Sequence, residues 1–283
     1  MKTGLVLEGG AMRGLFTAGI LDVMLDEGIK VDGMIGVSAG AAFGCSFKSG
    51  QRGRTLRYNL KYARDKRYCS LYSLLTTGDL YGADFCYHKL PEELDIFDND
   101  AFANNPTEFY LVCTDVTTGK PVYHKCETTD YQTMEWFRAS ASMPLVSRIV
   151  KVDGYQLLDG GVADAIPLAY FESIGYEKNL VILTQPAEYR KKESKLLPLI
   201  RRALGKYPHL VAVMEQRHNL YNQSAEWIQH REAEQDPNLM VLRPETALPM
   251  SRIEKNPEKL QQAYDMGRET ALKHLDAIKV FLG

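Results

Sequence analysis

The sequence has no excess of charge of either sign. Its 283 residues include 34 Lys and Arg against 36 Asp and Glu, which leaves a formal net charge of −2. A nucleic-acid-binding domain normally carries a strongly basic patch, and this charge balance offers none. With 45% hydrophobic and 25% charged residues, the composition is that of an ordinary globular protein. We therefore expect a folded chain that has no nucleic-acid partner.

A hydrophobic run long enough to cross a bilayer is also lacking. The longest uncharged apolar stretch, Gly33 to Phe47, has fifteen residues and contains four Gly and two Ser, whereas a crossing needs about 20 mostly apolar residues. Near the start, Glu8 interrupts the apolar residues before they reach signal-peptide length. The sequence therefore predicts a chain that does not span a membrane.

Cysteine is scarce and follows no pairing pattern. The five Cys are an odd number without a Cys-x-x-Cys spacing, which favours reduced thiols in the cytoplasm over a disulfide framework. No cluster of Cys and His shows the spacing of metal ligands. The sequence thus implies neither a metal nor a cofactor.

The first 50 residues alternate between two kinds of hydrophobic pattern. Apolar runs at 4–7 and 34–37 predict buried strands, while 14–28 follow the spacing of one helix face and the small residues 38–44 predict a second helix. Strand, helix, strand, helix in this order predicts an α/β fold with a mainly parallel central sheet sandwiched by helices. Such sheets place their ligand sites at the carboxyl ends of the strands.

The remaining elements fit a single domain, 1–283, because we find neither an internal repeat nor a Gly/Ser-rich linker. Within it we expect a core at 1–190, with irregular helices and loops at about 52–105 as a candidate lid, and a helical C-terminal extension at 191–283. Further predicted elements are hairpins at 109–115 with 121–125 and at 150–152 with 155–158, strands at 180–184 and 239–242, and a helix at 257–282 with Asn256 as its N-cap.

One five-residue motif points to chemistry. Residues 36–40 read Gly-Val-Ser-Ala-Gly, a G-x-S-x-G directly after a predicted strand. In a sharp strand-to-helix turn the central Ser is strained and its hydroxyl exposed, while Gly at both flanks removes Cβ atoms that would clash. The helix N-terminus behind Ser38 favours developing negative charge. Ser38 is thus a candidate nucleophile, and its alternative role is a plain helix N-cap.

A glycine-rich turn, residues 9–14 (Gly-Gly-Ala-Met-Arg-Gly), also lies between a predicted strand and helix. Such a turn presents backbone N–H groups to an anion, either a phosphate or the oxyanion of acyl transfer. Ala11 breaks the G-x-G-x-x-G pattern and no Gly-Lys-Ser/Thr follows, so the phosphate interpretation is weakened. An oxyanion hole needs only the N–H groups, which Ala also supplies.

The third motif, Asp159-Gly160-Gly161, follows the predicted strand at 155–158. A carboxylate within reach of Ser38 can accept the proton of its hydroxyl. A free Asp, with a pKa of about 3.9, is a weak base for an alcohol. The site therefore has to compensate through desolvation of Asp159, the helix dipole and the oxyanion donors.

The three motifs, in this order, resemble the patatin-like phospholipases, serine acyl hydrolases with a Ser–Asp dyad. Residues 138–144 (Arg-Ala-Ser-Ala-Ser-Met-Pro) and Ile166-Pro167 also match, and the resemblance spans about 4–185. It implies a lipid acyl hydrolase of phospholipase A, lysophospholipase or carboxylesterase type, with Ser38 as nucleophile and Asp159 as base. It further implies an oxyanion hole at Gly9, Gly10, Ala11 and Met12 and a supporting set of Arg13, Gly14, Gly36, Gly40, Gly160 and Gly161.

The sequence departs from the family pattern at two positions. The family usually has a third Gly where Ala11 stands, and often an Asn where Ala165 stands before Ile166-Pro167. The resemblance implies a fatty-acyl ester as substrate and transient contact with membranes. Acyl-chain length, headgroup and oligomeric state cannot be predicted from the sequence.

Two alternatives stay open. The order Ser, Asp, His of another esterase class could be completed by one of four histidines, His209, His218, His230 or His274. The departures at Ala11 and Ala165 also leave room for a catalytically weak lipid-binding member of the fold. The aromatic and basic residues at 58–90 fit a lid against membrane or substrate, although ordinary helix packing explains them better.

Overall fold

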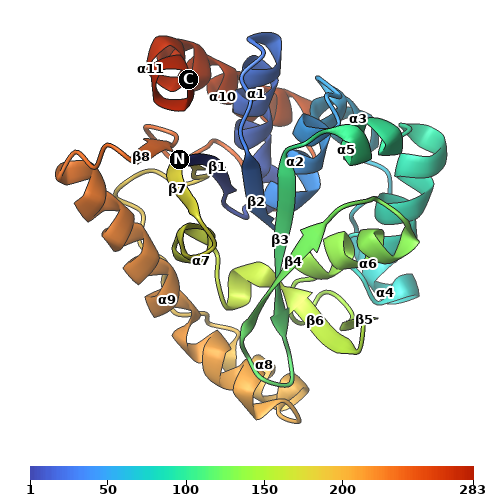
Figure 1. Cartoon of the computed structure of the whole chain (residues 1–283). Helices are drawn as coiled ribbons and strands as arrows, with labels where there is room; N and C mark the ends of the chain where they lie inside the picture. The colour runs from blue at the N-terminus through green and yellow to red at the C-terminus, as the bar shows by residue number, and fades with distance from the viewer.

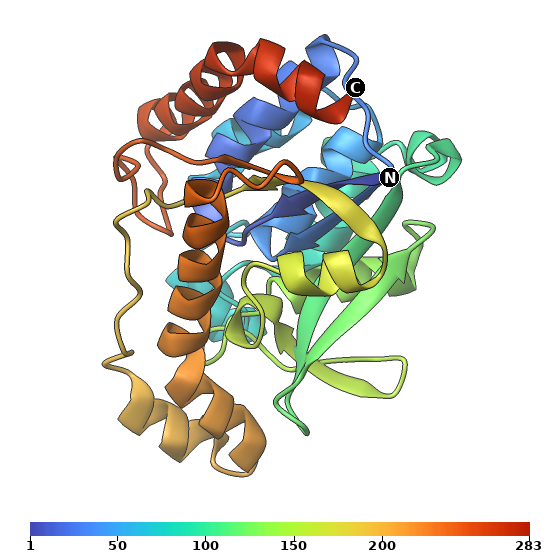
Figure 2. The ribbon, with the colours of Figure 1, turned by 60° about the vertical axis from the view of Figure 1, so that its left-hand side comes forward.

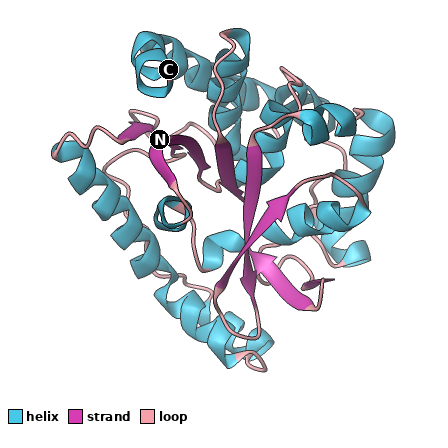
Figure 3. Cartoon of the chain, viewed as in Figure 1, coloured by secondary structure: helices cyan, strands magenta, loops and turns pink.

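A computed structural model describes residues 1–283 as one central sheet covered by helices (Figures 1 and 3). The strands are β1 (Lys2–Leu7), β2 (Gly33–Val37), β3 (Glu108–Asp115), β4 (Pro121–Cys126), β5 (Val150–Val152), β6 (Tyr155–Asp159), β7 (Tyr176–Ile182) and β8 (Leu239–Leu242). The α-helices are α1 (Gly14–Asp26), α2 (Ala39–Lys48), α3 (Arg54–Tyr62), α4 (Leu71–Thr77), α5 (Asn99–Asn104), α6 (Tyr131–Ser140), α7 (Leu168–Ser173), α8 (Leu197–Leu204), α9 (Pro208–Ala233), α10 (Pro257–Lys273) and α11 (Leu275–Leu282). Two short 3-10 helices, η1 (Ala11–Arg13) and η3 (Gly160–Val162), and a π-helix, η2 (Phe85–Leu94), complete the set.

The eight-stranded sheet has the order β5-β6-β3-β2-β1-β7-β8, with β4 paired to β3. The five strands from β3 to β8 along this order are parallel to their neighbours, whereas β4, β5 and β6 join by antiparallel pairs. The predicted α/β class, the two hairpins and the strand at 239–242 are confirmed. Strand β7 begins four residues before the predicted 180–184, because polar residues at its start hide the edge of the apolar run.

Alternating side chains on β1 explain why helices cover both faces. Leu5 and Leu7 pack into a core cluster with α1, α10 and α11. Val6 points the other way, into a cluster with α7 and α9. Figure 2 shows these two groups of helices on opposite sides of the sheet. The buried strands therefore lie between two layers, as a parallel sheet requires.

The segment predicted as irregular helices and loops, 52–105, contains α3, α4, η2 and α5 and packs against α2 (Figure 1). Its aromatic residues Tyr58, Tyr62, Tyr68 and Phe85 are buried in a cluster with side chains of α1 and α2. Helix packing, the interpretation favoured from the sequence, thus accounts for these four residues.

The C-terminal helix predicted at 257–282 is two helices. Asn256 caps α10 as expected, since its side chain accepts a hydrogen bond from the Glu258 N–H at 3.0 Å. At His274 the backbone leaves the helical region (φ −108°, ψ 13°) while ring atom Nδ1 lies 2.9 Å from the Thr270 carbonyl oxygen. The change of direction lets Ile278 of α11 reach the core beside α1. None of the helices combines the length and apolar character that a bilayer crossing requires.

Candidate active site

Strand β3 brings the G-x-S-x-G and Asp-Gly-Gly motifs together. Val37, the last residue of β2, pairs with Val112 of β3, and Asp159, the last residue of β6, pairs with the next β3 residue, Cys113. Both pairs use the same edge of β3, because β4 occupies the other edge. Since β2 runs parallel to β3 and β6 antiparallel, the two carboxyl ends face each other. Ser38 and Asp159 are thereby brought to one place from 121 positions apart in the chain.

The backbone turn at Ser38 is strained. Its dihedral angles are φ 54° and ψ −118°, a conformation that costs a residue with a side chain about 1–3 kcal/mol. A Cβ at Gly36 would lie 2.5 Å from the Ala41 nitrogen, and one at Gly40 would lie 2.5 Å from the Leu7 carbonyl oxygen. Only Gly allows this approach at both flanks, so the motif has the sharp strand-to-helix geometry that exposes a nucleophile.

A buried hydroxyl holds this turn. The Ser38 N–H donates to the Ser140 Oγ at 2.9 Å, and the same Oγ donates to the Val112 carbonyl oxygen at 2.7 Å. Ser140 has no solvent exposure. In the sequence, Ser140 is one residue of the 138–144 block, and nothing there indicates a role for it. Its contacts show that it ties the turn to β3.

Asp159 is buried, with 5% of its surface exposed. Burial raises the pKa of its carboxyl above the ordinary value, and this outweighs the opposing effects of the Arg217 guanidinium, the Gly161 N–H and the Ser38 side chain. The Gly161 N–H donates to the carboxylate at 2.7 Å. The desolvation that a carboxylate base requires is therefore present. The Ser38 hydroxyl itself makes no hydrogen bond of ordinary geometry, and it lines one pocket together with Asp159.

The glycine-rich loop lies against Ser38, the candidate nucleophile. A Cβ at Gly9 would be 3.1 Å from the Cβ of Ser38. The N–H groups of Gly9, Gly10 and Ala11 donate to no group of the protein, and all three residues line the pocket that contains Ser38. Three consecutive free donors beside a candidate nucleophile have the character of an oxyanion-binding site.

The next residues of the loop have other contacts. The Met12 N–H donates to the Arg252 carbonyl oxygen at 3.3 Å, so this donor is already engaged. Ala11 has a φ of +49°, in the left-handed region that favours Gly. The Arg13 side chain lines the pocket, and its buried Nε has no partner. Gly14 lies under the Phe43 ring, which would be 2.9 Å from an added Cβ.

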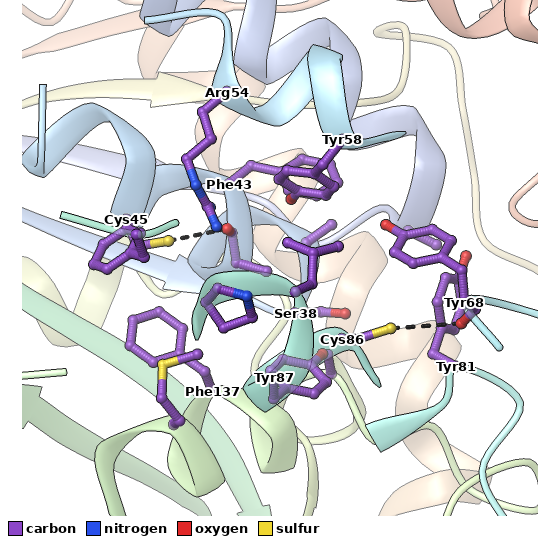
Figure 4. Close-up of a pocket in the computed structure, with 18 of the residues that line it drawn as sticks. Ser38, Phe43, Cys45, Arg54, Tyr58, Tyr68, Tyr81, Cys86, Tyr87 and Phe137 are labelled. Atoms are coloured by element: carbon purple, nitrogen blue, oxygen red, sulfur yellow. Dashed lines mark hydrogen bonds between the residues drawn. The ribbon is translucent and has the colours of Figure 1, made fainter. Parts of the chain in front are cut away.

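Ser38 lies where two pockets of opposite character meet. One pocket has about 930 Å³ of free space, its open mouth included, and 17 of its 21 lining residues are hydrophobic. Figure 4 shows rings of Phe43, Tyr58, Tyr87 and Phe137 around Ser38, from α2, α3, η2 and α6. The second pocket is mostly polar and contains Asp159 and the glycine-rich loop. Candidate lid residues of 52–105 thus line the apolar pocket as well as packing the core.

No histidine reaches this site. The six His of the chain lie outside both pockets that Ser38 lines, so none has the position of a third triad member. The same holds for His209, His218, His230 and His274, which the sequence left as candidates. The chain also brings no three His, Cys, Asp or Glu side chains together in an arrangement that could hold a metal ion.

Comparisons with known proteins agree with these motifs. A family model described as patatin-like phospholipase matches residues 5–172, and a model described as a domain of unknown function matches residues 207–283. The chain is 27% identical to the uncharacterized protein YjjU of Escherichia coli over 66% of this chain and 53% of that protein. It is 25% identical to the lysophospholipase nte1 of Aspergillus oryzae over 62% of this chain and 11% of that protein.

The chain spans about half or less of the length of these curated relatives. Among solved structures, VipD from Legionella pneumophila aligns with 98% of this chain and 67% of its own, with a TM-score of 0.46 and 11% identity. The phospholipase model covers more than half of the chain and includes all three sequence motifs. The chain therefore belongs to the patatin-like phospholipase family.

Proposed function

We propose that the protein hydrolyses fatty-acyl ester bonds of lipids, with Ser38 as nucleophile and Asp159 as base. The observation that carries the proposal is the meeting of three features at Ser38: a strained turn, free N–H donors and a buried carboxylate in the same pocket. The apolar pocket next to Ser38 supplies a surface for a fatty-acyl chain. Family membership supports the same reaction class.

The proposed reaction begins when the Asp159 carboxylate accepts the proton of the Ser38 hydroxyl. The Ser38 oxygen attacks the ester carbonyl carbon, and the N–H groups of Gly9, Gly10 and Ala11 stabilise the oxyanion. Asp159 returns the proton to the leaving alcohol as the carbon–oxygen bond breaks, which leaves an acyl-serine. Asp159 then takes a proton from water, the hydroxide attacks the acyl carbon, and the fatty acid leaves as Ser38 regains its proton.

Two features offset the weakness of a carboxylate base. Burial raises the pKa of Asp159, which brings its basicity closer to that needed at neutral pH. The loss of one oxyanion donor typically costs about 2.7–4 kcal/mol of transition-state stabilisation, so a loop with several free donors supplies a large share of catalysis. We therefore propose that the loop contributes as much to catalysis as Ser38 and Asp159 do.

The substrate class is proposed as a lipid with an ester-linked acyl chain, of phospholipase A or lysophospholipase type. The Aspergillus oryzae relative is named a lysophospholipase, which supports this class. So does the contrast between the apolar pocket and the polar pocket, both of which include Ser38 and which match the two ends of such a lipid in character.

The test is hydrolysis of a panel from short p-nitrophenyl esters to phospholipid vesicles. We expect wild-type turnover, and we expect Ser38→Ala and Asp159→Ala to abolish it while circular dichroism shows a folded chain. A fluorophosphonate probe should label wild type and not Ser38→Ala. Full turnover in either variant would refute the assignment, and a folded wild type that neither labels nor turns over would favour a lipid-binding protein.

A further inference from the structure

The polar pocket beside Ser38 holds a surplus of unpaired positive charge. Its lining includes two carboxylates and four cations: Glu8, Asp159, Arg13, Lys191, Arg217 and Arg252. None of the four cations forms an ion pair with a carboxylate within 4.0 Å, whereas their neighbour Arg190 pairs with Glu226 at 3.3 Å. Unpaired cations gathered in a part-buried pocket repel one another, so they favour a bound anion.

The two carboxylates of the pocket are occupied by other groups. Glu8 accepts hydrogen bonds from the Thr184 N–H at 2.6 Å, the Thr184 hydroxyl at 3.1 Å and the Tyr221 hydroxyl at 2.9 Å. Asp159 accepts from the Gly161 N–H. Burial, followed by Arg217, lowers the pKa of Lys191 to about 7, although Glu8 opposes this shift. The two carboxylates are fewer than the four cations, so the pocket keeps a net positive charge.

Three of the four cations come from segments that the sequence motifs do not include, whereas Arg13 belongs to the glycine-rich turn. Arg217 lies on α9, Arg252 lies between β8 and α10, and Lys191 follows β7. The first two belong to the region 207–283, which matches a domain of unknown function. The Arg217 Nε donates to the Gly161 carbonyl oxygen at 2.7 Å, and the Lys191 Nζ lies 4.0 Å from the centre of the Tyr221 ring. The C-terminal region is thus anchored directly at the catalytic motifs.

We propose that this pocket binds a phosphate group on the alcohol side of the scissile ester, and that residues 207–283 form the headgroup-recognition element of the chain. The inference rests on the proposed function, in which the apolar pocket takes the acyl chain and leaves the polar pocket for the alcohol. The surplus of cations in the pocket repels a quaternary ammonium group. A lysophospholipid with a bare phosphate is therefore a better substrate than one that ends in choline.

The test compares kcat/KM for three substrates with the same oleoyl chain: lysophosphatidic acid, lysophosphatidylcholine and monooleoylglycerol. Wild type should prefer lysophosphatidic acid over monooleoylglycerol by about tenfold or more, since a hydrogen bond to a charged group contributes about that factor. Arg252→Gln and Lys191→Gln should each lower this preference by about tenfold. The matched control is Lys192→Gln, which removes the same charge from an exposed residue outside the pocket, and its preference should equal that of wild type.

The outcomes separate this inference from the proposed function. If no ester is hydrolysed and Ser38 does not label, both fail. If p-nitrophenyl butyrate is hydrolysed in a Ser38-dependent manner but the preference is unchanged in Arg252→Gln and Lys191→Gln, only the inference is overturned. A competition experiment provides a further test, in which ester hydrolysis should be inhibited more strongly by glycerol phosphate than by inorganic phosphate. Equal inhibition would overturn the headgroup assignment in favour of a free-phosphate site.

Discussion

Replacing Ser140 with Ala tests whether one buried hydroxyl holds the nucleophile turn. The substitution leaves the buried Ser38 N–H without its acceptor, at a cost of about 1–3 kcal/mol. That cost is similar to the backbone strain of Ser38 at φ 54° and ψ −118°. Without the hydrogen bond, we therefore expect the turn to relax toward an unstrained conformation. We expect the free energy of unfolding to fall by about 2 kcal/mol. We expect kcat to fall by about 10- to 100-fold, because a small displacement of the nucleophile is costly.

The control for this variant is Ser142→Ala. The Ser142 hydroxyl is also buried and donates to the Arg138 carbonyl oxygen at 2.8 Å, at the same end of α6, without touching Ser38. Urea denaturation gives the stability of each variant, and p-nitrophenyl butyrate hydrolysis gives kcat and KM. KM should change little in Ser140→Ala, since Ser140 does not line the apolar pocket. If the two variants lose kcat equally, the hydroxyl of Ser140 does not hold the turn.

The structure supports four further predictions. Gly40→Ala puts a Cβ 2.5 Å from the Leu7 carbonyl oxygen, so urea denaturation should show a loss of about 1–3 kcal/mol, and esterase activity should fall with it. The raised pKa of Asp159 predicts that kcat/KM for a neutral ester falls on acidification at a pH above the ordinary Asp value of about 3.9, because the protonated carboxyl cannot accept the nucleophile's proton. Arg217→Gln removes a cation that lowers this pKa, so the acid limb of the pH–rate profile should move to higher pH. Lys191 has a pKa of about 7 and therefore loses its positive charge as the pH rises. For a phosphate-bearing ester, kcat/KM of wild type should fall above about pH 7. In Lys191→Gln, kcat/KM should stay flat over the same pH range.

The parts of the fold that local chemistry controls were predictable from the sequence. Asp153 and Gly154 adopt φ values of +50° and +80°, as the predicted two-residue hairpin requires, because this dipeptide tolerates the left-handed region. The apolar runs at 4–7 and 34–37 became the parallel strands β1 and β2 because nothing polar interrupts their burial. Motifs that lie within a few residues are likewise visible without the structure.

The parts that depend on long-range pairing were not predictable. No local pattern indicates that β3 pairs with both β2 and β6 along one edge, which is what brings Ser38 toward Asp159. Ser140 holds the turn through hydrogen bonds with Ser38 and Val112, which lie 102 and 28 positions away in the chain. Its residue type alone therefore does not indicate this role. From the sequence alone, Arg217 cannot be told apart from a solvent-exposed arginine on a long surface helix. Only the packing of α9 against the site shows that its side chain lines the polar pocket.

The charge of the whole chain and the charge of the polar pocket have different consequences, the first for attraction to a membrane and the second for substrate preference. A net charge of −2 over the whole chain gives no long-range attraction to an anionic membrane. At physiological salt the screening length is about 8 Å, so the cations of the polar pocket act only on a group that has already entered it. For the proposed lipid substrate, we therefore expect the apolar pocket to supply the first attraction and the cations to act on the phosphate once it lies near Ser38. Added salt should accordingly weaken the preference for the phosphate-bearing substrate less than it would weaken binding to an exposed basic patch, because part-buried charges are screened less.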